Sequence, residues 1–149
     1  LFEVGNIAFY SRLLDGQYPD TDRLIPTEST TSVEFELPVL ARSLERASLL
    51  THESRNNVVK MTLDVQKQLV KLQGDSPEIG NVEEEIGFKN LEGEGLTISF
   101  NPDYLREALR ASITDSIVMN FTQPLRPFTV IPAKQDVNFT QLITPVRTF

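Results

Sequence analysis

The chain has 149 residues, a formal net charge of −7, no cysteine and one histidine. The lack of cysteine excludes disulfides and thiolate metal sites, and a lone histidine cannot form a histidine cluster, so we expect a cytoplasmic protein without a metal centre. No apolar run reaches the roughly 20 residues of a membrane span. The acidic balance disfavours a surface that binds nucleic acid everywhere, because phosphate contacts need clustered Lys and Arg.

The first 26 residues predict short strands followed by an irregular segment. Residues 2–14 predict two strands interrupted at Val4-Gly-Asn6, with no partner strand for either. Residues 18–26 are Tyr-Pro-Asp-Thr-Asp-Arg-Leu-Ile-Pro, a stretch with too much proline to form a helix. Because the chain starts with Leu and its first strands lack a partner, we expect it to be a piece of a longer protein.

A strand and a helix are predicted next. Residues 32–37 alternate apolar and polar side chains, which predicts a strand. Pro38 is expected at the first position of a helix that reaches about Leu50, because its missing N–H costs nothing there. Three more strands are predicted at residues 57–63, 66–72 and 82–88, with turns at 74–77 and 80–81.

The same order of elements recurs in the second half. Residues 96–100 alternate as a strand, and Asn101 is predicted to cap a helix that starts at Pro102 and reaches about Ser112. Further strands are predicted at residues 116–121, 128–131 and 141–144. The two βαβββ repeats predict an α+β domain with both helices on one face of the sheets.

Each predicted helix carries a pair of arginines opposite its apolar stripe. Arg42 and Arg46 lie on the first helix, and Arg106 and Arg110 lie on the second, each pair at an i, i+4 spacing. From the residues alone, an ordinary solvated helix face explains this pattern, because a glutamate lies beside each pair. A face that meets phosphate groups is the functional alternative.

Three consecutive glutamates, residues 83–85, stand within a predicted strand. Consecutive acids repel one another and are depleted from strands. Protection of a sheet edge against aggregation accounts for them as well as a partner-binding edge does.

The last segment, residues 142–149, has the sequence Leu-Ile-Thr-Pro-Val-Arg-Thr-Phe. Like residues 18–26, it sets proline and arginine among apolar residues. A packed linker and a docked tail explain the two segments separately, whereas an apolar concavity with a few polar groups would take an extended peptide. Catalysis finds little support, because the carboxylates lie in turns and the glycines lack the context of a phosphate loop.

In residue order and chain position, both segments resemble the bacterial DNA polymerase III beta subunit, the sliding clamp. In that family a Tyr/Phe-Pro-Asp segment with a following Arg and apolar residue closes the middle domain, and the chain ends in Pro-(Met/Val)-Arg. The resemblance implies that residues 1–26 are the end of the middle domain and the interdomain linker. Residues 27–149 would be the C-terminal, third clamp domain.

The resemblance also implies three sites. The peptide-binding residues would be Pro19, Arg23, Leu24, Leu142, Thr144, Pro145, Val146 and Arg147. The DNA-facing residues would be Arg42, Arg46, Arg106, Arg110 and Arg55. The residues of the dimer interface would be Leu49, Leu50, Glu83, Glu84 and Glu85. Thr144 departs from the family, since some members have Met there, and the Gly-His-Arg-Leu-like part of the pocket is absent.

The implied function is that of a DNA replication processivity factor without a cofactor and without catalytic activity. A ring would encircle duplex DNA and tether the DNA polymerase III catalytic subunit, the clamp loader, mismatch-repair proteins and other polymerases through short peptides. The full-length protein would be a homodimer, and this chain alone a monomer, with no membrane contact. The alternative is a non-catalytic peptide- or protein-binding module of another repeated α+β family.

Overall fold

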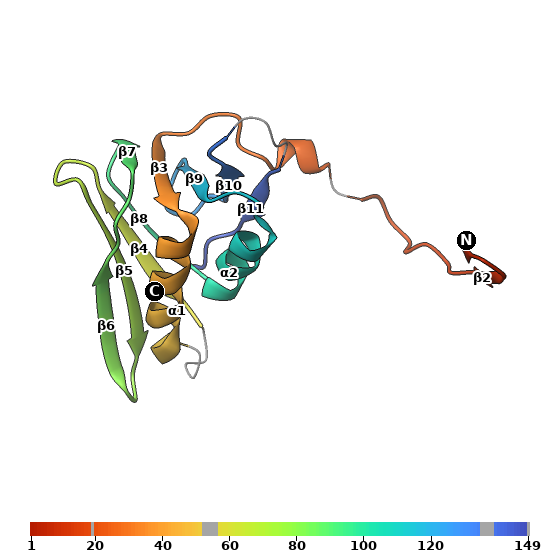
Figure 1. The fold of residues 1–149 in the computed structure, drawn as a ribbon, viewed down its shortest axis with the longest axis horizontal. Coiled ribbons are helices and arrows are strands. Elements are labelled where there is room, and N and C mark those ends of the chain that lie inside the picture. Colours follow the sequence, from red (N-terminus) through yellow and green to blue (C-terminus); the bar gives the residue numbers. More distant parts are fainter. Residues whose placement is uncertain (19, 52–56, 135–138, 149) are drawn as a thin grey trace.

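The computed structural model describes residues 1–18, 20–51, 57–134 and 139–148. Strands β1 (Phe2–Val4) and β2 (Ile7–Phe9) form an antiparallel hairpin whose turn contains Gly5 at a φ of +59°. This arm projects away from the rest of the chain (Figure 1), and all its side chains are exposed. The two short strands were predicted, but the expectation that neither had a partner was wrong, because they pair with each other.

Two antiparallel sheets follow the arm. The first has the order β11-β10-β9-β3-β7, and the second has the order β6-β5-β4-β8. The strands of the first sheet are β3 (Thr31–Glu36), β7 (Asn90–Gly93), β9 (Ser116–Phe121), β10 (Phe128–Pro132) and β11 (Gln141–Ile143). Those of the second are β4 (Val59–Asp64), β5 (Leu69–Ser76), β6 (Gly80–Glu85) and β8 (Leu96–Phe100).

The helices α1 (Leu37–Thr51) and α2 (Pro102–Ala111) pack against each other and against the sheets. In Figure 1, α1 runs along the second sheet, and α2 lies beside it towards β11. The predicted apolar stripes are buried on both helices: Leu40, Leu44 and Ala47 on α1, and Leu105, Ala108 and Leu109 on α2. The predicted cap is also confirmed, since the Asn101 side chain accepts a hydrogen bond from the Asp103 amide at 2.9 Å. Within the described ranges, no helix is long and apolar enough to cross a membrane.

The chain order contains two βαβββ series, β3-α1-β4-β5-β6 and β8-α2-β9-β10-β11. The first strand of each series lies in the sheet formed by the other series, since β3 pairs with β9 and β8 pairs with β4. Strand β7 was not predicted, and it extends the first sheet beside β3.

The predicted turn at residues 74–77 was wrong, because Gly74 lies inside β5. A Cβ atom on Gly74 would lie 2.3 Å from the carbonyl oxygen of Ala47 in α1, so glycine is needed there for close helix packing. The turn after β5 spans residues 77–79, so the predicted turn at residues 80–81 was also wrong, because both residues lie in β6. The turn before β5 spans residues 65–68, where the strand predicted at residues 66–72 was expected to begin; there Gln68 has a φ of 50° and Asp64 Oδ1 accepts from the Lys67 amide at 3.0 Å.

Three phenylalanine rings hold the two sheets together. The ring centroid of Phe128 lies 5.5 Å from that of Phe100 and 5.0 Å from that of Phe121, and all three side chains are fully buried. Phe100 comes from the second sheet and the other two from the first. The core therefore bridges the two sheets where β8 and β9 end and β10 begins.

Candidate functional site

A groove lies between the N-terminal linker and the loop that joins β9 to β10. Its volume is about 280 Å³, and its lining residues are Arg23, Leu24, Ile25, Pro26, Thr122, Gln123, Arg126 and Pro127. We call it the linker groove. Leu24 is 52% exposed and Ile25 is 38% exposed, so apolar side chains are accessible there. Arg23 stands at the surface, with Nε 3.0 Å from Asp20 Oδ2.

Backbone hydrogen bonds hold the linker in this position. The Leu24 amide donates to the Thr21 carbonyl at 3.0 Å and closes the single turn η1 (Thr21–Arg23). Further along, the Thr30 amide donates to the Phe121 carbonyl at 2.8 Å. The linker is thereby fastened to the end of β9, where the second wall of the groove begins.

The C-terminal tail crosses from one sheet to the other. Leu142 belongs to β11, which pairs with β10 in the first sheet. Pro145 then bridges to Phe100 of β8, and the Val146 amide donates to the Ser99 carbonyl at 2.7 Å. The tail therefore lies along the side of β8 that faces away from β4.

Two of the predicted peptide-binding residues, Arg23 and Leu24, line the linker groove. Pro19 falls outside the described residues. The tail residues are not among those that line the groove; they are Leu142, Thr144, Pro145, Val146 and Arg147. The tail residues therefore do not line the linker groove itself, although the tail begins at β11, which pairs with β10 at the end of the groove's second wall.

The loop of residues 122–127 supplies a wall that the sequence analysis missed. Its sequence, Thr-Gln-Pro-Leu-Arg-Pro, combines proline and arginine as the two terminal segments do, so the same signal marked it. The tail starts beside this loop, because Ile143 lies opposite Phe128 in the β10–β11 register. A hollow that exposes leucine and isoleucine side chains between arginines and other polar groups suits an extended peptide with apolar anchors and a polar or acidic end.

The predicted arginines of the helical face differ in their partners. Arg42 and Arg110 are exposed and form no ion pair within the part of the chain that the structure describes. Arg106 is paired with Asp103, one turn earlier on α2. Arg55 falls outside the described residues. Few cations on α1 and α2 are therefore unpaired and available to an external anion.

Between the two helices lies a shallow groove of about 170 Å³. Arginine and glutamate side chains both reach it, and its lining residues are Leu37, Ala41, Leu44, Glu45, Arg106, Leu109 and Arg110. The mixed charge weakens the electrostatic attraction of this face for phosphate compared with a purely basic face.

The three glutamates of β6 alternate between the two sides of the sheet. Glu84 is on the α1 side, where Arg46 Nε donates to its Oε2 at 2.9 Å. Glu83 and Glu85 are on the other side, where Lys71 of β5 forms an ion pair with each. Counter-charges on both sides explain why a strand accommodates three consecutive acids.

These contacts lower the pKa of two of the glutamates. The hydrogen bond from Arg46 holds the pKa of Glu84 below its ordinary value of 4.5. Hydrogen bonds from Lys71 and Gln73 do the same for the pKa of Glu83. Both carboxylates are charged at neutral pH, and each forms an ion pair within this chain.

Acid should therefore loosen this edge of the second sheet. Since the folded pKa values of Glu83 and Glu84 lie below 4.5, their contribution to stability is present above that pH and is lost as the pH falls through the folded values. Urea unfolding from about pH 7 to about pH 3 would measure the loss. The free energy of unfolding of the Glu83→Gln/Glu84→Gln variant should fall less over that range. Equal falls in the variant and the unaltered chain would contradict the assignment.

The end of α1 places apolar surface near this edge. Leu49 is 67% exposed and Leu50 is half-buried in the last turn of the helix. Within the described residues, β6 pairs only with β5, so its other side presents unpaired backbone groups. An exposed leucine on the helix that packs against an edge strand favours contact with another protein strand.

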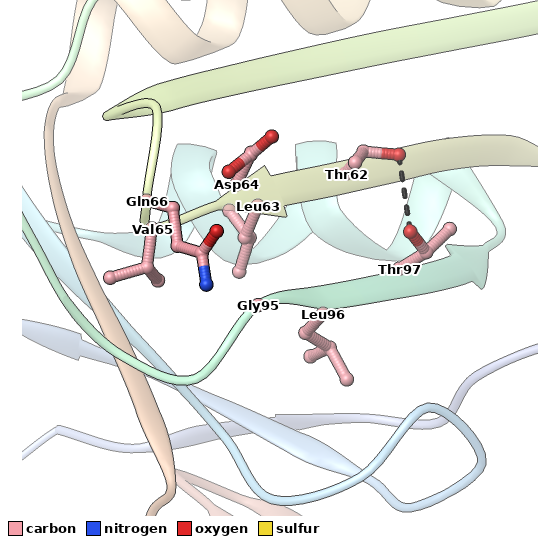
Figure 2. A pocket seen from close by; sticks show the side chains of 8 residues that line it. All are labelled: Thr62, Leu63, Asp64, Val65, Gln66, Gly95, Leu96 and Thr97. Atoms are coloured by element: carbon pink, nitrogen blue, oxygen red, sulfur yellow. Dashed lines mark hydrogen bonds between the residues drawn. The ribbon is translucent and has the colours of Figure 1, made fainter.

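A separate hollow of about 300 Å³ lies where β4 ends and β8 begins (Figure 2). The hydroxyls of Thr62 and Thr97 lie 3.3 Å apart along one side of it. Its carboxylate, Asp64, already accepts the Lys67 amide and has a pKa lowered mainly by that bond. The hollow contains none of the predicted site residues, and across the described ranges no group of three His, Cys, Asp or Glu side chains could hold a metal ion.

The sequence and fold of this chain are similar to those of known proteins. The family model described as DNA polymerase III beta subunit, C-terminal domain, matches residues 22–147. The chain belongs to the DNA polymerase III beta subunit family. The family resemblance drawn from the two terminal segments is thereby confirmed.

Relatives of this beta-subunit chain are similar along almost its whole length. The beta sliding clamp of Streptococcus pneumoniae serotype 4 strain TIGR4 is 49% identical over 148 residues, which cover 99% of this chain and 39% of that protein. The beta sliding clamp of Bacillus subtilis strain 168 is 44% identical over 149 residues, which cover all of this chain and 39% of that protein. The chain thus spans about two fifths of the length of the relatives it matches.

The fold of this beta-subunit chain is also that of the family. The crystal structure of the DNA polymerase III beta chain from Streptococcus pneumoniae matches it with a TM-score of 0.86 and 47% identity, over 92% of this chain and 36% of that one. The predicted α+β clamp fold is confirmed. The alternative of another repeated α+β family is not favoured.

Proposed function

We propose that this chain is the C-terminal part of a bacterial sliding clamp that serves as a DNA replication processivity factor. In this proposal residues 1–26 are the end of the middle domain and the linker, and residues 27–149 are the third domain. The observation that carries it is the match of residues 22–147 to the C-terminal domain of the DNA polymerase III beta subunit. The exposed apolar side chains of residues 1–18 support a position covered by the rest of a middle domain.

The mechanism would be topological and would need no catalytic group. Two protomers form a closed ring around duplex DNA in the cytoplasm, and the helical face of each points towards the DNA. Arg42 and Arg110 are its unpaired cations among the described candidates, whereas Arg46 and Arg106 are paired with carboxylates. Few phosphate contacts allow the ring to slide, because non-specific affinity rises with the number of phosphates neutralised.

The protein partners would dock at the linker groove and the adjacent tail. Peptides from the DNA polymerase III catalytic subunit, the clamp loader, mismatch-repair proteins and other polymerases would compete for this surface. The apolar Leu24 and Ile25 would receive their anchors, and Arg23 or Arg126 would meet a polar or acidic end.

Grafting tests this function directly. In a hybrid protein, this chain would replace the matching part of the Streptococcus pneumoniae beta sliding clamp. The hybrid would then be loaded on nicked circular DNA. A closed clamp should remain on the circle and leave when the circle is cut, because its attachment is topological. Loss from the uncut circle, with the unaltered S. pneumoniae clamp retained as the control, would refute the proposed function.

The two unpaired arginines should dominate the salt dependence of duplex binding. In the hybrid, Arg42→Ala/Arg110→Ala removes two arginines from each of the two protomers and should flatten the slope of log K against log salt by up to about 4, since each phosphate contact contributes about 1. The matched control is Arg46→Ala/Arg106→Ala, which removes two arginines that already have carboxylate partners and should change the slope less. Fluorescence anisotropy on a short duplex measures both, and a larger effect in the control would contradict this order.

The linker groove should bind a clamp-type peptide. In an NMR titration of the chain with Gln-Leu-Ser-Leu-Phe, amide shifts should concentrate at the non-proline residues of segments 23–26, 122–127 and 146–148. Leu24→Ala should weaken this binding, whereas Arg12→Ala, an exposed arginine on the arm, should not. Shifts spread evenly over the chain, or shifts equal to those of a scrambled peptide, would count against the assignment.

A further inference from the structure

One cluster of side chains ties α1 to the edge strand β6. Arg46 Nε donates to Glu84 Oε2 at 2.9 Å, and its Nη2 contacts Oε1 of the same carboxylate. The hydroxyl of Ser43, one turn earlier on α1, donates to that Oε1 at 2.7 Å and lies 3.2 Å from Arg46 Nη2. Ser43 is buried, and the Glu84 side chain is 21% exposed. We call these three residues the α1–β6 clasp.

A second contact fixes the same part of α1. The carbonyl oxygen of Ala47, the residue after Arg46, would lie 2.3 Å from a Cβ atom on Gly74 of β5, and Thr51 Cγ2 would lie 3.0 Å from it. The end of the helix therefore rests directly on the backbone of β5. With the clasp on one side and Gly74 below, the last turns of α1 have little freedom to move against the β5–β6 hairpin.

The clasp joins two elements that each carry an outward-facing feature. Leu49 comes three residues after Arg46, so the two side chains share one side of the helix. Leu49 is 67% exposed, although it is a large apolar side chain. Glu84 sits in β6, whose unpaired side is the free edge of the second sheet within the described residues. The Arg46–Glu84 contact, together with the packing of α1 on Gly74, therefore fixes the end of α1 that carries Leu49 against the β5–β6 hairpin.

We propose that the clasp is a positioning device for partner binding at the β6 edge, and that Arg46 serves this contact instead of DNA. The partner is the neighbouring protomer, which must pair with the β6 backbone and cover Leu49 in one step. The inference rests on the proposed function, in which this edge closes the ring. A contact that combines strand pairing with an apolar anchor needs the strand and the anchor in a fixed relative position. If one is displaced slightly, the partner that fits the strand no longer fits the anchor.

The test uses the hybrid ring and compares two arginines of the same helix. The clasp variants are Arg46→Ala, Glu84→Gln, their double variant, and the charge-reversed pair Arg46→Glu/Glu84→Arg. The control is Arg42→Ala, an exposed arginine without an ion pair in the described chain. Two quantities are measured for each protein: the dissociation constant of the dimer, by analytical ultracentrifugation over a range of concentrations, and the salt slope of duplex binding.

Arg46→Ala and Glu84→Gln should each weaken the dimer by about tenfold, and the double variant should be no weaker than either one, because they remove the same interaction. The charge-reversed pair should recover much of the loss, which a general loss of folding would not allow. Arg42→Ala should leave the dimer constant unchanged and flatten the salt slope. The inference is overturned if Arg46→Ala leaves the dimer constant unchanged, or flattens the salt slope as much as Arg42→Ala.

The failure of the proposed function would be distinguishable from the failure of this inference. If the unaltered hybrid forms no ring, the proposed function fails before any variant is made. Hydrogen exchange on the 149-residue chain then tests the clasp alone, since Arg46→Ala should speed exchange of amides in residues 44–51 and 80–85. Unchanged exchange in both segments would overturn the clasp as a positioning device.

Discussion

Replacing Leu49 with aspartate in the hybrid ring should leave mainly monomers under conditions in which the unaltered hybrid is dimeric. Leu49 is 67% exposed on the helix that packs against an unpaired edge strand, which suits an apolar anchor at a protein contact. In the closed ring the new carboxylate would be buried without a partner, so the dimer constant should weaken by at least about 100-fold. Analytical ultracentrifugation measures the change.

The control for this variant is Ile113→Asp. Ile113 is 79% exposed after the end of α2 and belongs to none of the predicted sites, so its replacement should leave the dimer intact. A Leu49→Asp hybrid that remains a closed dimer would remove this surface from the interface. The isolated chain should be unaffected by either change, because both side chains are exposed in it.

Replacing Phe128 with alanine should cause the largest loss of stability in the isolated chain. The ring is fully buried and contacts both Phe100 and Phe121, so its removal leaves a cavity between the two sheets. Buried Phe→Ala changes cost about 3–5 kcal/mol, a large share of the stability of an ordinary domain. Urea unfolding at neutral pH measures the difference. Phe9→Ala, which truncates a ring that is 61% exposed on the arm, should change the free energy of unfolding little.

The loss at Phe128 should also reach the C-terminal tail. Phe100, its neighbour in the core, bridges to Pro145, and the next residue along the tail bonds to the Ser99 carbonyl. Hydrogen exchange at the Val146 amide should therefore quicken more in Phe128→Ala than in Phe9→Ala. Equal rates in the two variants would indicate that the tail is held independently of the core.

The sequence predicted best those features that repeat along one element. The stripe of Leu40, Leu44 and Ala47 follows the helical period, and Asn101 before Pro102 is a local capping signal, so neither needs knowledge of the rest of the fold. The order of the two βαβββ series was predictable for the same reason. The family resemblance then supplied the expected clamp fold.

Features that depend on distant partners were not predictable. Arg46 and Glu84 are 38 residues apart, and their contact depends on which side of β6 the glutamate occupies. Gly74 carries the local signature of a turn, but the close approach of α1 makes it part of a strand. The second wall of the linker groove comes from residues 122–127, far along the chain from the linker. The roles of the predicted site residues stay predictions until the experiments above are done.

The exchange of strands between the two sheets has a consequence for folding and for motion. Because β3 completes the sheet of the second series and β8 completes that of the first, neither half of the domain has a whole sheet of its own. The halves should therefore fold and unfold together in one cooperative step, slowed by the many pairings between distant residues. In the proposed ring, opening during loading would then occur at the junctions between domains, since this domain cannot part along its middle without losing both sheets.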